Sequence, residues 1–191
     1  MKKYGKNKGE YGYRRNHRKM QVCMVAFGGA MILLQLAARN FTDSQAAKNI
    51  LTVMAILSVL PTANIASPML AAWRIKTPAG GFYEKVRLYE ERCTILYDLI
   101  ITSKEAIMPM DAVAVHPTGV YCYCTSGKID GKKGETFLNG MFSEHRLASH
   151  VKIIKDETTF FHRLDSLKAA SEYEDDGSVE YSANLLKNLS M

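Results

Sequence analysis

The chain has 191 residues, of which 47% are apolar, 25 are Lys or Arg and 19 are Asp or Glu. This composition, with only four cysteines, excludes collagen-like repeats, low-complexity disorder and a disulfide scaffold. The charge is unevenly distributed, because residues 1–20 contain eight basic residues and one acidic residue, whereas the rest of the chain has a net charge of −1. The basic character therefore belongs to the N-terminal segment.

Residues 1–19 form a basic tail that we expect in the cytoplasm. Cations near an anionic membrane surface contribute about 1 kcal/mol each to binding. Tyrosines among the cations would also suit nucleic acid, but no RNA-binding motif accompanies them, so lipid is the favoured partner. We expect anionic lipid headgroups to be bound by eight cations: Lys2, Lys3, Lys6, Lys8, Arg14, Arg15, Arg18 and Lys19.

Two uncharged segments follow, at residues 20–38 and 49–73, separated by a short external loop at 39–48. As a helix, the first is about 28 Å long, close to the thickness of bilayer hydrocarbon. Pro61 and Pro68 are expected to bend the second. The pattern predicts two transmembrane helices that return as a hairpin and pack through small residues: Ala26, Gly29 and Ala30.

The orientation of this hairpin is predicted by the flanking charges. The basic tail precedes the first span and Arg74 and Lys76 follow the second, whereas the loop carries only Arg39 and Lys48. Cytoplasmic flanks are enriched in Lys and Arg, so we expect a multi-pass protein of the cell membrane, of the bacterial inner-membrane type, with both termini cytoplasmic. A signal peptide or a pair of buried core helices is the alternative; no convincing cleavage site follows the first apolar segment.

Residues 80–173 are predicted to form a small α+β domain, and the acidic residues 174–191 a flexible C-terminus. The turn 116–119 has Pro and Gly at the positions that favour a hairpin. The apolar patterns predict a helix, three strands, a helix, a strand and a helix, at 82–92, 94–102, 106–115, 120–125, 135–150, 151–155 and 158–173.

Three stretches within this domain, at 81–86, 110–121 and 126–131, occur in an order that resembles the restriction-endonuclease-like superfamily. The likeness is to its nuclease-related domain (NERD) and Mrr-like branches, with a glycine and an aromatic residue before Glu84, and with Asp111 opening a strand that ends in a Pro-x-Gly turn. The resemblance implies a central strand at 120–125, flanked by strands 106–115 and 151–155.

Active members of that superfamily carry Glu-x-Lys on the third strand, and the matching positions here are Cys124 and Ser126. If Val115 pairs with Val120, Asp111 lies opposite Cys124, and we expect a cleft formed by Asp111, Cys124 and Ser126. Nuclease chemistry needs hard oxygen ligands for magnesium and a cation near the phosphate, whereas this set offers one carboxylate, a thiol and a hydroxyl. The cysteines also suit small core positions.

The sequence therefore favours a membrane-anchored domain that resembles a catalytically degenerate nuclease, with a binding or scaffolding role and no cofactor. One alternative is an active membrane-bound nuclease that uses Mg²⁺, with Glu84, Asp111 and Lys128 as catalytic candidates. Another is a membrane-anchored regulatory module that senses a partner or lipid. The expected partners are the lipid bilayer and a possible protein partner, and no metal site is predicted.

Overall fold

The computed structural model describes residues 7–75, 77–103, 106–127, 129–147, 150–174 and 176–191. These residues form two compact units. The helical unit comprises residues 15–75, and the globular unit comprises residues up to 14 together with those from 77 onward. The globular unit thus contains chain from both sides of the helical unit.

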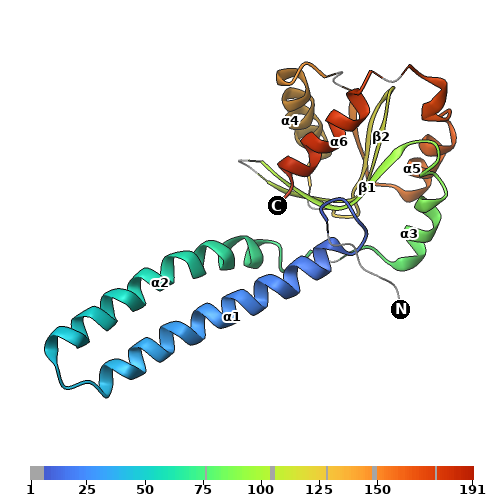
Figure 1. Cartoon of the computed structure of the whole chain (residues 1–191). Helices are drawn as coiled ribbons and strands as arrows, with labels where there is room; N and C mark the ends of the chain where they lie inside the picture. Colours follow the sequence, from blue (N-terminus) through green and yellow to red (C-terminus); the bar gives the residue numbers. More distant parts are fainter. Residues whose placement is uncertain (1–6, 76, 104–105, 128, 148–149, 175) are drawn as a thin grey trace. The chain divides into compact units, whose positions relative to one another are not determined.

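The helical unit consists of α1 (Tyr13–Asn40, its first two residues belonging to the globular unit) and α2 (Gln45–Ala71). Figure 1 shows the two helices side by side and antiparallel, joined by a short turn. Both are long and apolar enough to cross a membrane. α2 continues as a helix through Pro61 and Pro68.

Close packing between these helices occurs at Gly28, where an added Cβ atom would overlap the side chain of Thr62. One helical turn of α2 earlier, the Ser58 hydroxyl donates a hydrogen bond to Gln35 Oε1 at 3.3 Å. A Cβ atom on Gly29 would meet nothing within 4 Å. The prediction of Gly29 as a packing residue is therefore wrong, and the adjacent glycine has this role.

The globular unit contains a four-stranded mixed sheet in the order β1 (Thr94–Thr102), β2 (Ile107–His116), β3 (Gly119–Tyr123) and β4 (Val151–Ile154). The first three strands are antiparallel, and β4 runs parallel to β3. Val115 pairs with Val120, as the turn chemistry predicted. The α+β class and the predicted neighbours of β3 are confirmed.

Helices cover both faces of this sheet (Figure 1). One core contains Leu138 and Phe142 of α4 and Leu186 of α6, and the other contains Val86 of α3 and Phe160 of α5. The helices of this unit are α3 (Gly80–Arg87), α4 (Gly131–Glu144), α5 (Glu157–Asp165), the short 3-10 helix η1 (Ala170–Glu172) and α6 (Ser178–Leu189).

The predicted flexible C-terminus, residues 174–191, requires correction. Most of it is helix α6, which buries Ala183, Leu185 and Leu186 against the sheet. Beyond the helix, the Ser190 hydroxyl accepts a hydrogen bond from the N–H of Ile100 in β1, and the Met191 N–H donates to the Ile100 carbonyl. Burial of these side chains and pairing with β1 give the segment a fixed place in the fold.

The predicted separate segment of the basic tail, residues 1–19, also requires correction, because its described part belongs to other elements. Residues 7–14, here called the strap, belong to the globular unit, and α1 begins within them at Tyr13. Gly9 forms a bridge with Tyr97 of β1, and Lys8 Nζ donates to the Ser190 carbonyl. Together with the C-terminal residues, the strap covers the outer edge of β1.

The opposite edge of the sheet is capped by side chains from α4. Asn139 accepts a hydrogen bond from the Val151 N–H at 2.9 Å and donates to the Val151 carbonyl at 3.2 Å. Glu135 accepts one from the Ile153 N–H at 2.8 Å. Edge strands with unpaired backbone groups invite pairing with another chain, and these side chains block it. A partner of this unit is therefore not expected to add a strand at β4.

A buried Asp–Arg–Asp cluster at the candidate site

Asp98 of β1 and Asp111 of β2 lie across from each other in the sheet, between the pairs Tyr97–Ala112 and Leu99–Met110. Asp98 adopts a left-handed backbone conformation, with φ of 56°. Non-glycine residues rarely do so, although Asp is among those that tolerate it best. In a regular strand, Leu96 and Leu99 would point to opposite faces of the sheet, because successive side chains alternate. Here both lie in the same core, so the alternation along β1 shifts by one residue at Asp98. β2 makes the same change next to Asp111.

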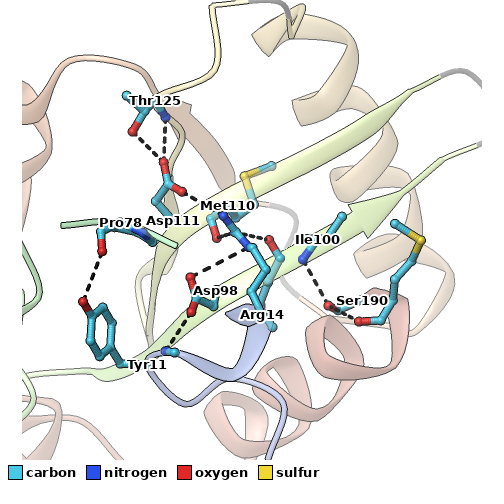
Figure 2. A network of polar contacts seen from close by, with 12 residues as sticks. Tyr11, Arg14, Pro78, Asp98, Ile100, Met110, Asp111, Thr125 and Ser190 are labelled. Carbon is cyan, nitrogen blue, oxygen red and sulfur yellow. Dashed lines mark hydrogen bonds and ion pairs between the residues drawn. The ribbon is translucent and has the colours of Figure 1, made fainter. Parts of the chain in front are cut away.

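The guanidinium of Arg14, from the strap, lies between these two aspartates (Figure 2). Its Nη1 is 3.4 Å from Asp111 Oδ1 and its Nε is 3.8 Å from Asp98 Oδ1. Its Nη2 donates hydrogen bonds of 3.1 Å to the carbonyls of Leu99 and Met110. All three charged residues are buried, with 7% of Arg14, 1% of Asp98 and 7% of Asp111 exposed.

The second oxygen of each carboxylate is also bound. The Gly12 N–H, in the strap, donates to Asp98 Oδ2 at 2.7 Å. The Thr125 N–H donates to Asp111 Oδ2 at 3.0 Å, and the Thr125 hydroxyl donates to the same atom (Figure 2). The cluster therefore joins the strap to β1, β2 and the segment after β3.

The electrostatic balance of this cluster is set by one guanidinium and two carboxylates. Burial raises the pKa of the Asp98 carboxyl above its ordinary value, whereas Arg14 and the Gly12 N–H oppose the rise. Removing one member of a buried ion pair is costly because the remaining charge loses its compensation. Arg14 thus stabilises two acidic groups that would otherwise be buried without a cation.

The structure brings Asp111 into this cluster but distributes the other predicted site residues elsewhere. Glu84 lies on α3 and is exposed. Cys124 is fully buried in the core with α4 and α6, and its Sγ lies 3.9 Å from the Ser126 carbonyl. Thr125, between the two predicted cleft residues, is the one that binds Asp111. Lys128 lies outside the described residues.

Burial also determines the chemistry of the thiols. It raises the pKa of Cys124, and it raises that of Cys93 to about 11. A thiol is nucleophilic and ligates metal as the thiolate, so these groups are held in their unreactive form. Within the described ranges, no group of three or more His, Cys, Asp or Glu side chains could hold a metal ion.

The predicted membrane-surface cations fall into three groups. Arg14 is buried in the cluster and is therefore not available to lipid headgroups. Lys8 donates a hydrogen bond to the Ser190 carbonyl. Arg15 and Lys19 are exposed on α1, and Arg18 is half-buried. Lys2, Lys3 and Lys6 lie outside the described residues.

Arg14 and Asp98 were not identified from the sequence. A lone aspartate within the apolar strand sequence TILYDLIIT was the available signal, because a charge at the centre of a buried strand requires a partner. Nothing in the tail distinguishes Arg14 from its neighbour Arg15. Comparison of the chain with protein-family models, curated protein sequences and solved structures found no match.

Proposed function

We propose that α1 and α2 anchor this protein in a membrane as a hairpin, and that the globular unit is a binding or scaffolding domain at the membrane surface. The observation that carries the proposal is the strap. It precedes α1, yet it is part of the same globular unit as the chain that follows α2. Only an even number of crossings brings both segments to one side of a bilayer.

Contacts of Tyr11 support this arrangement. Its hydroxyl donates a hydrogen bond to the Pro78 carbonyl at 3.1 Å, and its ring stacks on Tyr83 with centroids 4.2 Å apart. It also meets Tyr97 of β1 edge-on at 6.3 Å. The segments that enter and leave the helical unit are thereby fixed to each other as well as to the sheet. A cytoplasmic location of this end fits the excess of cations next to it.

The likeness to a nuclease fold is supported by the sheet order, because β3 lies between β2 and β4, the neighbours that the resemblance implies. Catalytic degeneracy is supported by the cluster. Asp111, the carboxylate that would help to hold a metal ion in an active relative, is bound by Arg14 and Thr125. We therefore propose that this site contributes to the structure of a scaffold rather than to cleavage.

Reporter fusions test the anchoring. A reporter fused after Met191 should be cytoplasmic, and one inserted near Gln45, where α2 begins after the turn that follows α1, should be external. If both reporters lie in the same compartment, the hairpin proposal is wrong.

A nicking assay tests the degenerate site. The full-length chain in detergent should leave supercoiled DNA intact in the presence of Mg²⁺ or Mn²⁺. Metal-dependent nicking that is lost in both Asp111→Asn and Glu84→Gln would instead establish an active nuclease. The use of two substitutions on different elements separates loss of catalysis from loss of folding.

A further inference from the structure

Arg18 and Trp73 form a pair at one end of the helical unit. The guanidinium lies 5.8 Å from the centre of the indole ring, within the range of a cation–π interaction. Its Nη1 also donates a hydrogen bond of 3.2 Å to the Trp73 carbonyl. A guanidinium carries five N–H donors, and this bond uses one of them. The pair joins the first turns of α1 to the residues that follow α2.

Three further cations lie close to this pair in the chain. They are Arg15, Lys19 and Arg74. Arg15 and Lys19 lie three residues before and one residue after Arg18, and this i, i+3, i+4 spacing places all three on one face of α1. Arg74 follows the tryptophan and is exposed. The single acidic residue of the helical unit is Asp43, in the turn at the opposite end. Within the helical unit, no carboxylate therefore lies near this cationic end.

Exposed apolar side chains begin immediately beyond these charges. Met20 is 50% exposed and Leu70 is 65% exposed, and Trp73 itself is 50% exposed. A surface that changes from cations through an indole to apolar side chains matches the headgroup region of a bilayer, where tryptophan is enriched. Nucleic acid would supply phosphates for the cations but no apolar environment for these side chains.

We propose that the end of the hairpin formed by Arg18, Lys19, Trp73 and Arg74 binds the phosphate groups of anionic phospholipids. This inference rests on the proposed membrane anchoring and adds a lipid preference to it. The cations attract the phosphate, Arg18 offers donors to it, and the indole holds the pair at headgroup depth. Bound anionic lipid would fix the depth of this end of the hairpin in the bilayer.

Trp73 is the only tryptophan in the chain, so its fluorescence reports on this end alone. The full-length chain is reconstituted in vesicles of phosphatidylcholine and phosphatidylglycerol with constant composition. Bromine, which quenches tryptophan at short range, is placed either on all the phosphatidylglycerol or on an equal amount of phosphatidylcholine. We expect stronger quenching from brominated phosphatidylglycerol, corresponding to about fivefold local enrichment, which is the effect of about one fully engaged cation.

The test variant is the triple substitution Arg18→Gln, Lys19→Gln and Arg74→Gln, in which the two quenching signals should become equal. The matched control is Arg39→Gln with Lys48→Gln, which removes cations from the other end and should preserve the difference. High salt should reduce the enrichment in the unmodified chain, and this test needs no variant. Added inorganic phosphate at the same ionic strength should cause no further reduction if the site requires a lipid.

Failure of the lipid preference can be distinguished from failure of the anchoring. Equal quenching by both brominated lipids in the unmodified chain overturns the inference but leaves the membrane anchor intact. A chain that remains dissolved without detergent and shows no quenching by either lipid refutes the anchor as well. Loss of the difference in the control variant would show that general charge, and not this end of the hairpin, selects the lipid.

Discussion

Replacement of Arg14 by Met tests the cluster at its centre, because methionine retains much of the side-chain length but removes the charge. In the native protein the guanidinium lies 3.4 and 3.8 Å from the two carboxylates. With an effective dielectric constant of about 20, each pair contributes roughly 4 kcal/mol of Coulomb energy, before the cost of removing the charges from water. Measured losses on breaking buried ion pairs are about 3–5 kcal/mol.

We therefore expect Arg14→Met to lower the free energy of unfolding of the globular unit by about 3–5 kcal/mol. Folded proteins are stable by only about 5–15 kcal/mol, so this loss is a large fraction of the total. The matched control is Arg15→Met, which removes the neighbouring exposed cation. Exposed charges contribute about 0–1 kcal/mol, and the control should stay within that range.

The pH dependence of the loss has a definite sign. Burial raises the pKa of Asp98 in the folded protein, and removal of Arg14 takes away an opposing influence, so the pKa rises further. A carboxyl with a raised folded pKa binds its proton more tightly when folded. The contribution of this carboxyl to stability is therefore greatest below the unfolded pKa, about 3.9, and is lost as the pH rises through the folded value. The deficit of Arg14→Met should be smallest in acid and largest at neutral pH.

The assay must report on the globular unit, which Trp73 does not. That unit contains three buried cysteines, Cys93, Cys122 and Cys124, which become reactive only when it unfolds. Maleimide labelling at increasing urea concentrations, with the labels counted by mass spectrometry, therefore follows its unfolding. Asp98→Asn in the Arg14→Met background should recover part of the loss. Equal midpoints for Arg14→Met and Arg15→Met at neutral pH would refute the assigned role of the cluster.

Two other contacts make comparable predictions. Gly28→Leu should separate α1 from α2, because the leucine side chain would overlap Thr62. The control is Gly29→Leu, whose side chain would enter open space. Cysteine cross-linking between the two helices in detergent should fall in Gly28→Leu and remain unchanged in Gly29→Leu. Asn139→Leu should destabilise the globular unit by about 1–3 kcal/mol, since it leaves backbone groups of Val151 unpaired, and light scattering should show concentration-dependent association. Gly140→Ala, at an exposed position of the same helix, should instead stabilise by about 0.5–1 kcal/mol.

The sheet could be predicted because its determinants are local. The pattern of β1 is almost continuously apolar, and its boundaries agree with the prediction. The register between β2 and β3 follows from the turn that ends at Gly119, where φ is +146° and a Cβ atom would come too close to the His150 carbonyl. Fixing that turn fixes the pairing of Val115 with Val120. From that register, the facing positions of the two strands follow.

The parts that could not be predicted depend on contacts between distant segments. The acidic residues 172–180 concealed α6, although Leu185, Leu186 and Leu189 have helical spacing. Arg14 is separated from Asp111 by 97 positions, and no local pattern relates them. Cations before an apolar helix are commonly expected to face lipid, and here one of them, Arg14, compensates buried aspartates instead.

The position of Arg14 links folding of the globular unit to the start of the helical unit. Its guanidinium is held by Asp98, Asp111 and two strand carbonyls, and the next residue belongs to the helical unit. The outer edge of β1 is therefore complete only when the strap, which is synthesised before both apolar helices, meets strands that are synthesised after them. In the proposed hairpin, insertion of both helices leaves these segments on the same side of the membrane, where the strap can meet β1 and β2.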